Sequence, residues 1–298
     1  MRTTVCLTVT FAAAALTTLV PASARPPVEK RSIREYVALG DSWAADAAMT
    51  GVSSEFVPLA CAQSATSYAK QVAQALAVTQ FRDASCASAV TTDLTEPQAL
   101  PDGTVNPPQF DRLTPDTDLV TIEIGGNDAG LAAIVPTCLT TSPHLSNCAR
   151  MRTATDGEDR MSSAIRTAEP KVAATITGIR DRSPHARILL IDYLAGVSPG
   201  TGCYPHIPIT DEDANWLGHK LIELDTMLAR VATKTGVEFI DTYTGSVGHD
   251  ACRPTGTRWV EGLLPAAPEP AAGLAAPFHP NQLGADHQAQ QILRTLRN

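Results

Sequence analysis

Short apolar runs recur along the chain, separated by longer stretches with an apolar position every three or four residues. The runs predict buried strands, because continuous apolar segments bounded by turn residues are typical of parallel sheets. They lie at residues 36–39, 119–124, 188–191 and 237–240. Strands that alternate with helices predict an α/β fold, a three-layer α/β/α sandwich with a central parallel sheet.

The helical stretches each have one apolar face. The clearest pattern follows residue 216, where apolar residues recur at steps of four and three: Leu217, Leu221, Leu224, Leu228 and Val231. Segments 64–77 and 159–182 also predict helices. A bend of the 159–182 helix is expected at Pro170. A last helix is predicted after Asn281, whose side chain is suited to capping its first turn.

The N-terminal residues have the pattern of a secretory signal peptide. A basic Arg2 precedes a mostly apolar stretch at 5–20, and Ala22-Ser23-Ala24 matches an A-x-A cleavage site. The alternative is a membrane anchor, but the apolar stretch is short and is interrupted by threonines. The predicted organisation is a signal peptide at 1–24, a flexible leader at 25–34 and one domain at 35–298. No later segment has the roughly 20 apolar residues of a membrane helix, so stable membrane insertion is not expected.

Cysteine content and charge narrow the class of protein. The chain has seven cysteines, and removal of Cys6 with the signal peptide leaves an even set. We expect three disulfides, which persist outside the cell, although the sequence alone leaves the pairing open. The simplest pairing is sequential: Cys61–Cys86, Cys138–Cys148 and Cys203–Cys252. A net charge of −8 argues against a nucleic-acid partner, and no metal or cofactor motif is present, so neither is expected.

Two polar motifs follow predicted strands, at the edge where ligands bind in open α/β sheets, and a third precedes the last predicted helix. They are Gly40-Asp41-Ser42, Ile124-Gly125-Gly126-Asn127-Asp128 and Phe278-His279-Pro280-Asn281. In this order they resemble the serine, asparagine and histidine blocks of the SGNH (GDSL-type) hydrolases. The resemblance extends from Tyr36 to the last helix and implies a flavodoxin-like fold. It also implies the sequential disulfide pattern of secreted bacterial members.

The resemblance implies a role for one residue of each block. Ser42 is the expected nucleophile, and a serine hydroxyl needs an adjacent base. Of the seven histidines, His279 is the expected base, because it precedes the last helix in a turn. Asn127 and the Ser42 backbone N–H are the expected donors of an oxyanion hole.

Two positions depart from the family pattern. Ala276 stands where many members have an aspartate, three residues before the histidine, so we expect the backbone carbonyl of Ala276 to orient His279 instead. The glycine block is replaced by Ser85-Cys86-Ala87-Ser88-Ala89. Since a backbone N–H survives substitution, Ser88 is the expected third donor, with Ala87 as the alternative.

These residues predict a secreted serine carboxylesterase or lipase that works through an acyl-enzyme on Ser42. Its substrate is expected to be a small-molecule or lipid ester, and the Ala-, Pro- and Leu-rich segment 262–277 favours a lipid. Sugar deacetylases and phospholipases of the same family are alternatives. A non-catalytic secreted binding module is the alternative of another class. We expect a monomer.

Overall fold

The computed structural model of the chain describes residues 1, 3–5, 7–8, 32–149, 157–267 and 273–297. Most of the predicted signal peptide and leader lies outside the described residues, so these assignments remain predictions. Residues Ile33–Asn298 form one compact unit. Among the described residues, no helix is both long enough and apolar enough to span a membrane.

The core of the compact unit is a parallel sheet of five strands in the order β2-β1-β5-β6-β7. The strands are β1 (Glu35–Gly40), β2 (Gln80–Asp83), β5 (Leu119–Glu123), β6 (Arg187–Ile191) and β7 (Glu238–Ile240). The predicted α/β fold and the four predicted strands are confirmed. The edge strand β2 was not predicted, because its sequence Gln-Phe-Arg-Asp contains a single apolar residue.

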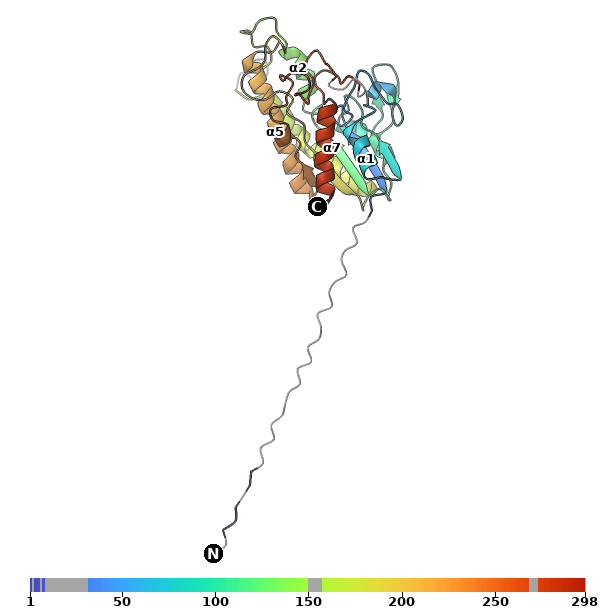
Figure 1. The fold of residues 1–298 in the computed structure, drawn as a ribbon, viewed down its shortest axis with the longest axis vertical. Helices are drawn as coiled ribbons and strands as arrows, with labels where there is room; N and C mark the ends of the chain where they lie inside the picture. The colour runs from blue at the N-terminus through green and yellow to red at the C-terminus, as the bar shows by residue number, and fades with distance from the viewer. Residues whose placement is uncertain (2, 6, 9–31, 150–156, 268–272, 298) are drawn as a thin grey trace. The chain divides into compact units, whose positions relative to one another are not determined.

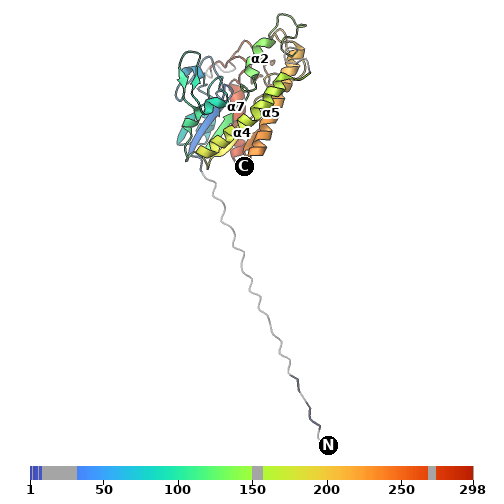
Figure 2. The same cartoon turned by 180° about the vertical axis from the view of Figure 1, so that it is seen from behind.

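Helices cover both faces of the sheet. The long helices α4 (Arg160–Arg182) and α5 (Asp211–Thr235) pack on one face, against alternate strand residues such as Val37 and Leu39. The helices α1 (Tyr68–Ala75) and α7 (Gln282–Arg297) pack on the other, against Tyr36 and Ala38. Figures 1 and 2 show these two layers from opposite sides. Alternate residues of each strand therefore point into different cores, as a pleated strand requires.

Capping side chains mark the starts of two of the predicted helices. The Asp159 side chain accepts hydrogen bonds from two backbone N–H groups of the first turn of α4, and the helix continues through Pro170. Asn281 accepts from the N–H groups of Leu283 and Gly284, which confirms it as the cap of α7. The helix predicted at 64–77 begins only at Tyr68.

Smaller elements surround this framework. They are α2 (Leu131–Cys138), α6 (Tyr243–Ser246), the antiparallel pair β3 (Gln98–Ala99) and β4 (Val105–Asn106), and the 3₁₀ turns η1 (Leu59–Cys61), η2 (Thr91–Leu94) and η3 (Gln109–Arg112). The three disulfides join Cys61 to Cys86, Cys138 to Cys148 and Cys203 to Cys252, which confirms the sequential pairing.

The connections of β1 and β5 place a crevice between these adjacent strands. From β1 the chain passes through α1 to β2 on one side, whereas from β5 it passes through α4 to β6 on the other. Ligands of open α/β sheets bind at such a switch point, outside the carboxyl ends of the strands. Gly40 and Glu123 pair at these two ends, so the turns that follow them face each other.

Candidate active site

The turn that carries Ser42 is held tightly against the end of the sheet. Gly40 has a φ of 139°, and a Cβ at this position would overlap the carbonyl oxygen of Glu123, so only glycine fits. The buried side-chain amide of Gln109 accepts from the Gly40 N–H and donates to the Gly40 carbonyl, both at 2.8 Å. Sequence reasoning missed Gln109, whose partner is 69 residues away.

The structure brings Ser42 and His279 together. His279 Nε2 lies 2.8 Å from Ser42 Oγ, across 237 residues of sequence. Burial lowers the pKa of His279 from its ordinary value of 6.5, and a backbone hydrogen bond partly opposes this change. The ring is therefore neutral at pH 7, as a general base must be.

The group that orients His279 differs from the prediction. The His279 Nδ1 atom lies 2.8 Å from the carbonyl oxygen of Pro277, so the assignment to Ala276 is wrong. The Ala276 carbonyl instead accepts the backbone N–H of His279, at 3.2 Å, and closes a turn. Proline in second place and the positive φ of Phe278, 60°, are the features of a type II turn. Because a carbonyl can only accept, Nδ1 carries the proton and Nε2 is left to accept from Ser42.

The buried ion pair of Arg258 and Glu261 supports the turn that carries His279. The Glu261 carbonyl accepts the N–H of Phe278 at 3.1 Å, and the Glu261 N–H donates to the His279 carbonyl at 2.9 Å. The Glu261 carboxylate accepts from Arg258 at 2.5 Å and from Asn281 Nδ2 at 2.7 Å. Arg258 and Glu261 are almost fully buried, so the turn rests on a charged pair that is shielded from water.

Asn127 lies beside the Ser42 turn, after β5. Its Nδ2 donates to the Ala89 carbonyl at 2.9 Å, which orients the amide and leaves a second N–H free to meet a ligand. Within the described part of the chain, the Ser42 N–H has no hydrogen-bond acceptor. Both groups are thus available as donors at the carboxyl edge of the sheet.

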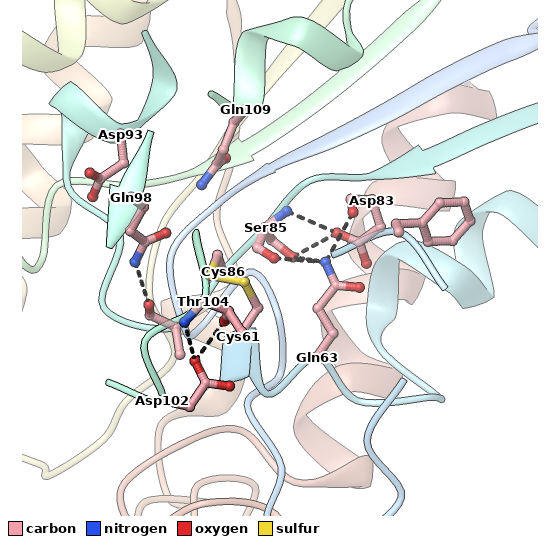
Figure 3. The surroundings of a disulfide bond; sticks show 12 residues. Cys61, Gln63, Asp83, Ser85, Cys86, Asp93, Gln98, Asp102, Thr104 and Gln109 are labelled. Carbon is pink, nitrogen blue, oxygen red and sulfur yellow. Dashed lines mark hydrogen bonds between the residues drawn. A yellow bond between two sulfur atoms is a disulfide. The ribbon is translucent and has the colours of Figure 1, made fainter. Parts of the chain in front are cut away.

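The segment that replaces the family's glycine block is anchored by the Cys61–Cys86 disulfide (Figure 3). The Ala87 N–H already donates to the Cys61 carbonyl at 3.0 Å, whereas Ser88 N–H has no acceptor among the described residues. Ser88 also has a positive φ, 65°, the conformation that favours glycine. These observations favour Ser88 over Ala87 as the third donor, an assignment that remains a prediction.

An apolar cavity of about 320 Å³ opens beside Ser42 and His279. Its size lies at the lower end of the range usual for small-molecule sites. Trp43 and Phe278, the neighbours of the two reactive residues, form part of its wall. Much of the remaining apolar surface comes from two helices: α2 contributes Leu131 and Val135, with Leu139 directly after its end, and α5 contributes Leu217, Leu221 and Leu224. Such a cavity suits a hydrocarbon chain.

Acidic groups near the site have other partners. Asp286 accepts a hydrogen bond from Gln282 at 2.7 Å, and Asp128 accepts from the backbone N–H and hydroxyl of Thr91. Burial raises the pKa of Asp41 to about 6, although hydrogen bonds from Tyr193 and the backbone oppose this shift.

In the described part of the chain, no group of three or more His, Cys, Asp or Glu side chains is arranged to hold a metal ion.

Comparison with known proteins identifies the family. The model of the GDSL-like lipase/acylhydrolase family matches residues 38–287. Lipase 2 of Streptomyces coelicolor is 31% identical over 277 residues, which cover 91% of this chain and 88% of that protein. Lipase 1 of the same organism is 30% identical over 260 residues, covering 85% of this chain and 84% of that protein.

Two solved structures share the fold. The extracellular lipase of Streptomyces rimosus has a TM-score of 0.65 at 23% identity, covering 88% of this chain and 99% of that one. Phospholipase A1 of Streptomyces albidoflavus has a TM-score of 0.62 at 21% identity, with the same coverage. From the family match and the identity to both Streptomyces coelicolor lipases, it follows that this chain belongs to the GDSL-like lipase/acylhydrolase family of ester hydrolases.

Proposed function

We propose that the protein is a secreted serine ester hydrolase, a lipase or esterase, in which Ser42 is the nucleophile and His279 the base. The observation that carries this proposal is the 2.8 Å contact between Ser42 Oγ and His279 Nε2 at the mouth of an apolar cavity. A serine next to a neutral imidazole is the arrangement that activates the hydroxyl for attack.

The reaction follows from this arrangement. Ser42 Oγ attacks the ester carbonyl carbon while His279 Nε2 takes its proton, and the carbonyl oxygen becomes an oxyanion. Asn127 Nδ2, the Ser42 N–H and the Ser88 N–H donate to that oxyanion. His279 then protonates the leaving alkoxide, the C–O bond breaks, and the acyl group remains on Ser42. His279 then deprotonates a water molecule, which attacks the acyl carbon. The acid leaves, and His279 returns the proton to Ser42 Oγ.

The Pro277 carbonyl takes the place of a carboxylate in this scheme. It accepts the Nδ1 proton of His279 and holds the ring in the required tautomer. A carbonyl has no full charge, so the imidazolium that forms during the reaction is stabilised less than it would be beside an aspartate. The site is therefore a dyad of Ser42 and His279.

The cavity favours an ester of an apolar acid. The apolar residues that α2 and α5 contribute to the cavity suit an acyl chain and offer few partners for sugar hydroxyls. Both Streptomyces coelicolor relatives are named as lipases, which agrees with this choice over a sugar deacetylase. Secretion is supported by the A-x-A motif before Arg25 and by the three disulfides.

Nitrophenyl esters of increasing acyl length, measured beside a phospholipid and an acetylated sugar, test this function. We expect hydrolysis of the nitrophenyl esters, with higher kcat/KM for chains longer than acetyl. Ser42→Ala is expected to abolish turnover, whereas Ser54→Ala, at an exposed serine, is expected to leave it unchanged. Lack of any turnover by the wild type would favour the non-catalytic binding module.

A further inference from the structure

Tyr193 reaches both turns that carry the proposed catalytic groups. It follows β6, and its side chain is buried between the Ser42 turn and the Asn127 turn. The phenol oxygen lies 2.9 Å from the backbone nitrogen of Gly126, the residue before Asn127. The same oxygen lies 2.6 Å from Asp41 Oδ2, on the residue before Ser42.

The direction of each hydrogen bond is fixed by the groups involved. A backbone N–H can only donate, so the Tyr193 oxygen accepts from Gly126. The single phenol proton is then directed to the Asp41 carboxylate, which also accepts the Trp43 N–H at 2.9 Å. The result is a buried chain of hydrogen bonds that runs from the Asn127 turn through Tyr193 to the Ser42 turn.

Close packing supplies a second, independent link between the two turns. A Cβ on Gly126 would lie only 3.0 Å from the Tyr193 oxygen, so glycine allows the backbone to approach the phenol ring. On the other side, the ring meets the edge of Trp43, with centroids 5.4 Å apart and planes at 70°. The ring and the hydroxyl of Tyr193 therefore both touch residues that flank Ser42 and Asn127.

We propose that Tyr193 is a positioning residue for ester hydrolysis, whose hydroxyl fixes Asn127 relative to Ser42 so that both donors meet one oxyanion. This inference rests on the proposed function. An oxyanion hole works only when its donors are already aimed at the place where charge develops. The Tyr193 hydroxyl is hydrogen-bonded to Gly126 and Asp41 and not to Ser42 or His279, so its effect is exerted through the two turns.

The structure offers a matched control for the loss of a buried phenol hydroxyl. Tyr36 is fully buried in β1, packs on the opposite face of the sheet, and its hydroxyl lies 2.7 Å from Thr121 Oγ1. Tyr193→Phe and Tyr36→Phe each delete one oxygen and its hydrogen bonds but keep the ring. A merely structural role for Tyr193 predicts similar effects of the two changes on turnover.

The test compares kcat and KM of the wild type, Tyr193→Phe and Tyr36→Phe on nitrophenyl butyrate. We expect Tyr193→Phe to lower kcat by about 10- to 100-fold with KM nearly unchanged, somewhat less than the ~10²–10³-fold loss of a whole oxyanion donor. Tyr36→Phe should keep kcat within about twofold. A kcat of Tyr193→Phe within twofold of the wild type would overturn the inference.

A double variant separates positioning from independent damage. If Tyr193 acts through Asn127, Asn127→Ala combined with Tyr193→Phe should be no slower than Asn127→Ala alone, because coupled residues are not additive. Losses that multiply in the double variant would contradict the inference. Absence of turnover by the wild type would instead refute the proposed function, and the inference with it.

Discussion

The buried pair of Arg258 and Glu261 gives a quantitative prediction about the histidine turn. Glu261→Gln keeps the size of the side chain but removes the charge that faces the Arg258 guanidinium. The two side chains are 2% and 1% exposed, so water cannot solvate the arginine that remains. The change also weakens the bonds that Glu261 accepts from Asn281 Nδ2 and the Ala266 N–H.

The size of the effect follows from this burial. Removing one partner of a buried ion pair typically costs about 3–5 kcal/mol, because an uncompensated charge stays inside. Domains of roughly this size lose about 2–4 °C of Tm for each kcal/mol. We therefore expect Glu261→Gln to unfold at a temperature about 6–20 °C lower. Because the Glu261 carboxylate also holds Asn281, two residues after His279, kcat should fall as well.

The assay is thermal and urea unfolding of the wild type and variants, together with kcat below the transition. Glu158→Gln is the control, because Glu158 pairs with Arg166 on the surface, where both side chains are more than half exposed. Its cost should be within about 1 kcal/mol. Replacing both buried partners, with Arg258→Met and Glu261→Gln, should recover part of the stability. A Tm of Glu261→Gln equal to that of the control would refute the reasoning.

Three further predictions concern the site. Asp286→Asn should keep most of the turnover, because Asp286 bonds to Gln282 and no carboxylate orients His279; a thousandfold loss with unchanged folding would contradict the dyad. Burial lowers the pKa of His279 below 6.5, so kcat/KM should fall only as pH drops below that value, and an acid limb above 6.5 would contradict the assignment. Gly196 faces Trp43 and Leu221 in the cavity wall, where a Cβ fits at 3.4 Å. Gly196→Val should therefore lower kcat/KM for long nitrophenyl esters relative to the acetate, and an unchanged ratio would place the acyl chain elsewhere.

Most of the framework could be predicted because its signals are local. The apolar runs of β1, β5 and β6 and the leucine spacing of α5 report burial directly. Asn281 could be recognised as a cap because the capping bond joins residues two and three positions apart. In contrast, β2 is a polar edge strand, and its pairing with β1 leaves no apolar pattern.

The site was less predictable where it depends on turn geometry or distant partners. The carbonyl that orients His279 belongs to Pro277 and not to Ala276, because the Ala276 carbonyl is used to close the turn. The proline at the second position of that turn was the available signal. Gln109 and Tyr193 contact the Ser42 turn across 69 and 152 residues. No local pattern in a single sequence indicates contacts of this kind.

The central claim is that Ser42, activated by His279, forms the acyl-enzyme. Its most direct test is mass spectrometry of the protein after reaction with a fluorophosphonate, which forms a stable adduct only with an activated nucleophile. We predict one adduct per chain, on the peptide that contains Ser42, and its loss in His279→Ala with the fold intact. An adduct on another residue, or equal labelling of His279→Ala, would contradict the account.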